Sequence, residues 1–541
     1  MIDLKKKWVL LLAIIPIVIY FGWLTCYGIN IPLFDDHAFK DFLLQWNKTD
    51  SILQKIQLLF AQHNEHRIAY TRFVILTIYG LTGQLNYVYL MWVGNLALLG
   101  ILLVFGKALF LEKPKPNSYL LYAIIPLALV LLTLQHHENT FWGMASIQNF
   151  GVVFWSLFCF YLLARQRFIP AMMVGFVATF SSGNGFLVLA IAALLLLLQK
   201  QNRRLIQWLI FSVLLSVFYF CGYTKPPGNP AEASLTQGFL VMKGFLVLIG
   251  GAFDVSFQTA EKERLWVSTL AGIIIFLPLI WLLVRELTRG FTNKKWDEWQ
   301  LFWVGASLFV LGTLGITVIT RLGFGESLLL TSRYKIYSVV LVMLVFAAFI
   351  RDVNQPKTVL MMVSLISLVY AGYVYFQQHN EVSFHRNYLI ASQFNSRSNP
   401  PNKLVPYQKP PTSLDNQWEE KPMMTSLIDT MYKVNQEWVV HNQNLEIGSG
   451  LNDAAFILVS SATNQVMFPT RQNRNLGKKN LLLTLQYYRK GFIGSFSETE
   501  VPNGNYSLSI VACKDGKTTV TPTGRSIEVQ LKDRKELLKN W

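Results

Sequence analysis

The chain has 541 residues, of which 52% are hydrophobic, 14% are aromatic and only 15% are charged. Soluble domains carry about a quarter charged residues, so this composition and the mean hydropathy of +0.35 exclude an ordinary soluble protein and indicate a polytopic membrane protein. The formal net charge is +17, but Lys and Arg collect in short clusters between apolar segments. That distribution is typical of cytoplasmic loops in membrane proteins, so we expect a lipid bilayer partner and no nucleic acid.

The N-terminus reads "MIDLKKKWVLLLAIIPIVIYFGWLTCYG", a basic start followed by an apolar stretch. Roughly 20 apolar residues span a bilayer, and no small-residue cleavage site closes this stretch. We therefore expect a retained first transmembrane helix instead of a removed signal peptide.

The basic clusters predict the topology of the rest. If all of them face the cytoplasm, an even number of crossings must separate neighbouring clusters. This predicts about eleven spans of the length that a bilayer requires, with the N-terminus in the cytoplasm and the C-terminus outside. The predicted spans are 8–27, 86–106, 118–134, 145–164, 168–182, 184–199, 205–223, 265–284, 299–320, 336–350 and 357–376.

Two apolar segments are not counted as spans. Segment 68–84 carries Arg72, and segment 236–257 carries Lys243 and Asp254. Because charges are costly in the middle of a bilayer, we expect both segments to be interfacial or half-inserted helices on the outer face.

The first outer loop, 28–85, contains two amphipathic stretches. In "HAFKDFLLQW" the apolar residues recur at i, i+3, i+4 and i+7, which predicts a helix lying along the membrane surface. "NKTDSILQKIQLLF" begins a second apolar stripe, with Ser51 and Gln54 in capping-box spacing. These helices hold the start of the loop at the mouth of the first span.

Two adjacent acids, Asp35 and Asp36, open this loop in "FDDHAF". One interpretation is that they stabilise the N-terminus of the following helix. The other is that one carboxylate acts as a general base while the second binds a metal or an acceptor. We favour the second, because like charges side by side repel and the pair is fixed between a span and a surface helix.

Further along the loop, "HNEHR" offers Glu65, His66 and Arg67. The segment is either a polar collar at the headgroups or a donor-phosphate site in which Arg67 supplies permanently charged donors and His66 assists. The spacing is not that of a zinc protease. Glu65 and His37 are further candidates for binding an acceptor or a metal.

A second polar cluster, "LQHHENTFWG", offers His136, His137 and Glu138. These residues are either structural, or they bind an acceptor hydroxyl or share a divalent cation, such as Mg or Mn, with one of the two acids of the first loop. Farther on, Arg333 and Tyr334 either snorkel at a helix start or form a second clamp on a lipid phosphate.

The region beyond 376 changes character. We expect a linker and a helix over 377–445, with the helix at 423–440, and a small extracytoplasmic antiparallel β-sandwich over 446–541. The strand-like runs are "AAFILVSS", "NLLLTLQYY", "NYSLSIVAC", "KTTVTP" and "SIEVQL", and "KDGK" at 514–517 is a two-residue hairpin signal. This domain shows no catalytic constellation of its own.

The layout of residues 1–376 resembles the GT-C superfamily of integral-membrane glycosyltransferases. "FDDHAF" is similar to the Asp-Glu motif in the first loop of protein O-mannosyltransferases: Asp35 matches the acid that acts there as catalytic base, and Asp36 stands where Glu is usual. "NEHRIAYTRFVILTIYGLTG" resembles the juxtamembrane helix after that loop, and "HHENTFWGMASIQ" lies where the second outer loop often carries another acid. The overall layout is also similar to bacterial glucosyltransferases that modify O-antigen or other surface polysaccharide.

The resemblance implies a polyprenyl-phosphate-linked sugar donor at the outer face of the bacterial cytoplasmic membrane. It implies inverting transfer to a hydroxyl of a glycan, lipid or protein acceptor, with a carboxylate removing the acceptor proton. A cation, Arg67 or Arg333, would stabilise the developing phosphate charge. The Asp in place of Glu at position 36 leaves metal dependence open.

Two alternatives remain on sequence. A membrane polysaccharide polymerase or ligase would use a large outer loop late in the chain, whereas the predicted loop 321–335 is short. A transporter or lipid flippase generally carries ionisable residues within its spans, and the predicted spans contain almost none.

Overall fold

The structure is a computed structural model. It is 67% helical and contains a C-terminal β-sheet domain, and it divides into two compact units, which are described separately. The first unit is Met1–Thr25 with Ala38–Gln378, and the second is Cys26–His37 with His379–Trp541. The described residues are 4–111, 122–225, 237–256, 259–293, 295–353, 356–396, 418–475 and 486–531.

Seven helices of the described chain are long and apolar enough to cross a membrane, which confirms seven of the predicted spans by length and composition. α9 (Gly143–Ala145) and α10 (Gly151–Ala164) form one such helix, joined by a π-helical turn at Ser146–Phe150. The other six are α5 (Tyr87–Leu109), α13 (Asn202–Phe220), α16 (Glu261–Thr292), α17 (Glu298–Arg321), α18 (Lys335–Asp352) and α19 (Pro356–Asn395).

The other four predicted spans correspond to described helices outside these seven, so the count of eleven remains a prediction. Part of the predicted span 118–134 lies outside the described residues. The two segments predicted to be half-inserted do form helices, α4 (Ala69–Thr82) and α15 (Gly238–Gly250). These four helices are α1 (Leu4–Tyr27), α7 (Ile124–Leu131), α11 (Phe168–Thr179) and α12 (Leu187–Leu198).

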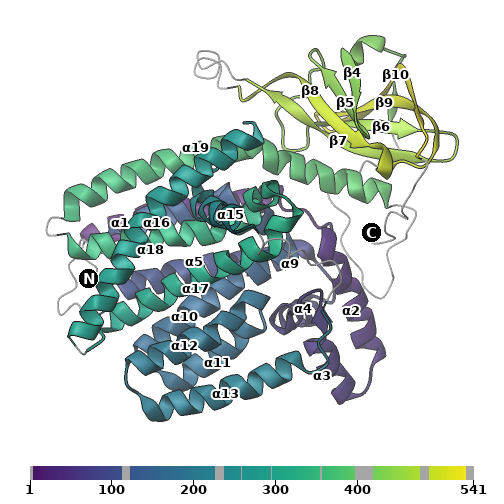
Figure 1. The fold of residues 1–541 in the computed structure, drawn as a ribbon. Helices are drawn as coiled ribbons and strands as arrows, with labels where there is room; N and C mark the ends of the chain where they lie inside the picture. Colours follow the sequence, from purple (N-terminus) through teal and green to yellow (C-terminus); the bar gives the residue numbers. More distant parts are fainter. Residues whose placement is uncertain are drawn as a thin grey trace. The chain divides into compact units, whose positions relative to one another are not determined.

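The first unit has a central and a peripheral set of helices. In the apolar stretches of α17 and α18, 61% and 67% of the residues are buried, against 17% in α13 and 28% in α16. α10 packs against α5, α11 and α17, and these helices run alongside one another (Figure 1). Because lipid is as apolar as leucine, the low burial of α13 and α16 is what lipid-facing helices require.

Close backbone contact fixes the crossing of α15 and α16. A Cβ added to Gly250 would lie 1.9 Å from the carbonyl oxygen of Ser268, and one added to Gly272 would lie 2.0 Å from that of Leu246. Only glycine permits this approach, as in other small-residue crossings of membrane helices. The crossing holds the 3₁₀ turn Gly251–Phe253 and the residues that follow it.

The segment 28–85, predicted to be the first outer loop, forms the two expected amphipathic helices. α2 (His37–Lys48) buries Phe39, Phe42 and Leu43. α3 (Ile52–Phe60) begins as expected, with the Ser51 hydroxyl accepting a hydrogen bond from the Gln54 N–H at 3.5 Å. The "HNEHR" segment forms a hairpin of β1 (Gln62–His63) and β2 (His66–Arg67).

The second unit contains eight strands in one connected sheet, in the order β3-β10-β9-β6-β7-β8-β5-β4, and its arrangement as a sandwich remains a prediction. The sheet is continuous because β7 pairs with both β6 and β8, and it buries a common apolar core. Its strands, green to yellow in Figure 1, are β3 (Glu419–Glu420), β4 (Thr430–Val434), β5 (Glu437–Asn442), β6 (Ala454–Ser460), β7 (Gln465–Arg474), β8 (Tyr488–Ser497), β9 (Gly504–Lys514) and β10 (Lys517–Val529).

The predicted helix at 423–440 is wrong. That segment contains the hairpin of β4 and β5, whose turn places Asn435 at φ +55°, a conformation that asparagine tolerates well. The predicted linker is also wrong at its start, because α19 continues to Asn395. Residues 397–417 lie outside the described chain.

Other strand predictions are confirmed. "AAFILVSS" forms β6 and "NYSLSIVAC" lies in β9, while "KDGK" turns with Asp515 and Gly516 at positive φ, as a type I′ hairpin requires. The two predicted strands "KTTVTP" and "SIEVQL" are one long strand, β10, interrupted by a bulge between Pro522 and Arg525. Most of "NLLLTLQYY" lies outside the described residues.

Candidate functional site

Asp35 and Asp36 lie in a short 3₁₀ turn, Phe34–Asp36, between α1 and α2 in the chain. Asp36 is fully buried, and its Oδ2 accepts a hydrogen bond from the Leu33 N–H at 3.3 Å. Asp35 is partly exposed, and the described residues offer its carboxylate no hydrogen bond or cation. The two adjacent acids therefore have different environments, one fixed by the backbone and one accessible.

The residue before the acids has a strained backbone. Phe34 has φ +44°, a region that non-glycine residues rarely adopt and that costs on the order of 1–3 kcal/mol. Its ring is 53% exposed, so burial of the ring does not explain the strain. Such outliers concentrate at functional sites, and this one begins the turn that contains both Asp35 and Asp36.

Glu65 and His66 belong to a small ion-pair group on the first unit. Arg321 Nη2 lies 3.1 Å from Glu65 Oε2, and His66 Nε2 lies 3.8 Å from the same oxygen. The imidazole packs against Gly183, where an added Cβ would lie 2.4 Å from His66 Nδ1. Glu65 is thus paired with Arg321, which the sequence prediction did not foresee.

Arg67 has a structural role, which corrects its assignment as a donor-phosphate ligand. The side chain is 9% exposed, and its guanidinium donates hydrogen bonds to the carbonyl oxygens of Phe60, Tyr219 and Cys221. Two of these carbonyls end α13, which leaves such groups without helical partners. Arg67 caps that helix and is not retained as a phosphate ligand.

The "HHEN" segment is anchored to two neighbouring helices. The Tyr20 hydroxyl of α1 lies 2.8 Å from Thr140 Oγ1 and donates to Asn95 Oδ1 of α5, while Asn95 Nδ2 donates to the Thr140 carbonyl at 3.0 Å. This network fixes the turn that carries His136, His137 and Glu138.

His136 is buried in the core, and its predicted role as a metal or acceptor ligand gains no support from the described residues. Its side chain is completely buried, with ring centroids 5.1 Å from Phe150 and 6.3 Å from Tyr20. Burial lowers its pKa to about 3, so the imidazole is neutral at physiological pH. His137 is also buried.

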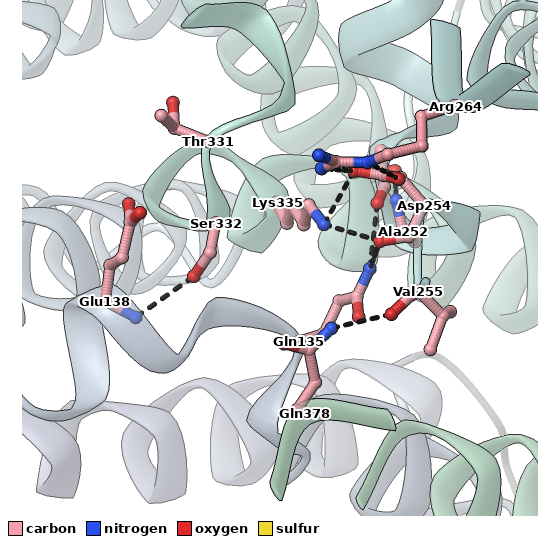
Figure 2. A network of polar contacts seen from close by, with 12 residues as sticks. Gln135, Glu138, Ala252, Asp254, Val255, Arg264, Thr331, Ser332, Lys335 and Gln378 are labelled. Carbon is pink, nitrogen blue, oxygen red and sulfur yellow. Dashed lines mark hydrogen bonds and ion pairs between the residues drawn. The ribbon is translucent and has the colours of Figure 1, made fainter. Parts of the chain in front are cut away.

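Glu138 and Arg333, which the sequence analysis placed in separate roles, are brought together. Glu138 Oε2 accepts a hydrogen bond from the Arg333 N–H at 3.2 Å. The Glu138 N–H donates to Ser332 Oγ at 3.0 Å (Figure 2). Asn139 Nδ2 donates to the Arg333 carbonyl at 2.8 Å. The Arg333 guanidinium packs over the Tyr334 ring, and its buried Nε has no acceptor among the described residues.

A third polar cluster was missed by sequence reasoning. Asp254 binds Arg264 through two hydrogen bonds, from Nε at 2.9 Å and from Nη2 at 2.7 Å, and Lys335 Nζ lies 2.9 Å from Asp254 Oδ2. The side chains of Asp254 and Lys335 are each only 2% exposed. Figure 2 shows the carboxylate between the two cations.

Two glutamines complete this cluster by holding its backbone. Gln135 Nε2 donates to the carbonyls of Gly251 and Asp254, and Gln378 Nε2 donates to that of Val255, all at 2.9–3.0 Å. Burial alone raises the pKa of Asp254, but the hydrogen bond from Arg264 and the charge of Lys335 outweigh it, so its pKa lies below the usual value. Both oxygens of the carboxylate are therefore engaged, and Asp254 has a structural role.

The metal hypothesis gains no cluster here: in the described part of the chain, no three His, Cys, Asp or Glu side chains are grouped so that they could hold a metal ion. Comparison with known proteins adds no assignment, since no family model, no curated protein and no solved structure matches this chain.

Proposed function

We propose that the chain is an inverting membrane glycosyltransferase that moves a sugar from a polyprenyl-phosphate donor to an acceptor hydroxyl on the outer face of a bacterial cytoplasmic membrane. Asp35 is the general base, and Asp36 positions it. In the step, Asp35 takes the acceptor proton, the acceptor oxygen bonds to the anomeric carbon, and the bond to the leaving phosphate breaks.

The observation that carries this proposal is the difference in exposure between the two acids of the Phe34–Asp36 turn. A general base must reach its substrate, which the partly exposed Asp35 can do, whereas Asp36 is buried against the Leu33 N–H. The positive φ of Phe34 supports a site under constraint. The Asp36–Leu33 bond belongs to a capping box at the start of the turn, so the accessibility of Asp35 and the strained backbone of Phe34 are what favour a catalytic role over a helix start.

We assign binding of the donor phosphate to Arg333, which belongs to the first unit. Its Nε is buried without an acceptor in the described chain, and Glu138 and Asn139 hold its backbone. A fixed guanidinium of this kind stabilises developing phosphate charge. The guanidinium of Arg67, in contrast, is already engaged by three carbonyl oxygens.

The second candidate, a transporter or flippase, is favoured by one observation. Asp254, Arg264 and Lys335 are charges in an apolar part of the chain, the feature that marks ion or proton paths in transporters. Each of them is paired, however, and both carboxylate oxygens of Asp254 already bind cations.

Transfer of labelled sugar from polyprenyl-phosphate donors to cell-envelope acceptors tests the proposal in isolated membranes. We expect Asp35→Asn to lower transfer by about 10²–10⁴-fold, the usual contribution of a positioned base. Asp41→Asn, which changes an exposed acid on α2, is the matched control and should retain transfer. Transfer in folded Asp35→Asn equal to that of Asp41→Asn would remove Asp35 from the chemistry, and would favour the transporter if substrate movement persisted.

A further inference from the structure

The second unit contains a small polar cavity that the proposed function does not use. It has a volume of about 30 Å³ and lies among residues 379–387 of α19, strands β6, β7 and β8, the loop before β6, and Tyr27. A water-sized probe needs roughly 10–15 Å³, so the space accommodates a group of a few heavy atoms and not a sugar ring. Its polar lining includes Asn380, Ser383, Arg386, Asn387, Ser449 and Gln472.

Arg386 dominates the cavity electrostatically. The residue is 4% exposed, and its Nη2 donates to Asn452 Oδ1 at 3.0 Å. Its Nε and Nη1 are buried and have no acceptor among the residues that the structure describes. A buried guanidinium with unused donors is costly, because burial of a charge requires a partner.

The nearby acids do not meet this need. Asp453 also lines the cavity, but its Oδ2 accepts from the Gly450 N–H at 2.7 Å and its Oδ1 from the Asp515 N–H at 3.0 Å. Glu381, one turn earlier on α19, pairs with Arg471 at 3.1 Å. The described carboxylates around Arg386 are therefore engaged elsewhere.

We propose that this cavity binds an oxyanion, a phosphoryl or carboxylate group, through Arg386. The guanidinium supplies the positive charge, and the neutral amides and hydroxyls of the lining supply further hydrogen bonds. The Asp453 carboxylate, which also lines the cavity, is held by two backbone N–H groups. The volume admits only the anionic end of a larger molecule, so the occupant is a free small anion or the charged group of a lipid headgroup or acidic saccharide. The site is independent of the glycosyl transfer proposed above.

The experiment measures thermal unfolding of the purified full-length chain in a neutral detergent. Inorganic phosphate, acetate, glucuronate and short-chain phosphatidic acid are added separately at constant ionic strength. A ligand that binds only the folded state raises Tm with concentration. We expect at least one anion to raise Tm in the wild type and in Arg489→Gln, which alters an exposed arginine of β8, and the apparent Kd to weaken at least tenfold in Arg386→Gln.

A second variant keeps the proposal testable if Arg386→Gln fails to fold. Ser449→Glu places a carboxylate at the exposed rim of the cavity and should raise Tm while abolishing the response to added anion. A response to phosphate or acetate identifies a free anion, and a response to phosphatidic acid or glucuronate alone identifies the headgroup or saccharide source. No response to any anion, or an equal response in Arg386→Gln, would overturn the proposal.

Discussion

Asp254 and Asp35 are both acids next to apolar segments, yet their surroundings are opposite. Asp254 is 2% exposed and binds both Arg264 and Lys335. Asp35 is partly exposed, and no cation of the described chain contacts it. A carboxylate that is fully paired stabilises a fold and has no capacity left for a substrate, whereas an accessible one held by a strained turn is available for proton transfer.

Two arginines show the same contrast. Arg67 and Arg386 are both nearly buried, but Arg67 donates to three carbonyl oxygens, while Arg386 has one donated bond and two unused nitrogens. Burial of a charged side chain therefore does not reveal its role. The number of its donors or acceptors already engaged does.

The largest loss of stability should follow substitution of Asp254, whose carboxylate is fully paired. Asp254→Asn leaves two cations without a counter-charge, and breaking a buried ion pair in this way costs roughly 3–5 kcal/mol. Denaturant unfolding in detergent measures the loss, with Glu263→Gln, an exposed acid at the start of α16, as control. If both variants were equally stable, Asp254 would not be a structural ion.

The second-largest effect should be a difference in stability between variants of Arg67 and Arg386. Arg67→Met removes hydrogen bonds from three carbonyls and should destabilise the first unit by more than about 3 kcal/mol, since charged hydrogen bonds are worth about 1.5–3 kcal/mol each. Arg386→Met should change stability by less than about 1 kcal/mol without added anion, because it also removes a poorly compensated buried charge. The same unfolding assay compares them, and equal losses would contradict the contrast.

A smaller effect should appear in the pH dependence. The folded pKa of His136 is about 3, against 6.5 as the ordinary value, so the unfolded chain binds a proton below pH 6.5 that the folded chain refuses. Stability from His136 is complete above pH 6.5 and falls as the pH drops toward 3, by about 2 kcal/mol at pH 5. His136→Phe should abolish this loss in unfolding curves at pH 7 and pH 5, and parallel losses would contradict the burial of a neutral imidazole.

Local pattern accounts for what the sequence could predict. Apolar length identified α5, α10, α13 and α16–α19, and the i, i+3, i+4 spacing of Phe39, Phe42 and Leu43 identified α2. The helix expected at 423–440 failed because Met424, Leu427, Ile428 and Met431 imitate helical spacing. The turn-forming Asn435 and the β-branched pair before His441 were the competing signal.

The site was less predictable because its contacts are long-range. Glu138 and Arg333, and Asp254 and Lys335, meet only through tertiary packing. Charge within an apolar segment marked Asp254 as unusual, but nothing local indicated that Arg264 and Lys335 neutralise it. Likewise, the permanent charge of Arg67 suggested a phosphate site. The guanidinium instead donates hydrogen bonds to carbonyl oxygens at the C-terminal end of α13, which is distant in sequence.

The most direct measurement compares Asp35→Asn with Asp254→Asn for both sugar transfer and stability. Transfer is scored per folded molecule, with a polyprenyl-phosphate sugar donor and membrane preparations matched for folded protein. We expect Asp35→Asn to be as stable as the wild type and to lose transfer by about 10²-fold or more, whereas Asp254→Asn should lose stability and keep transfer in its folded fraction. Full transfer in folded Asp35→Asn would contradict the assignment of Asp35 as the base.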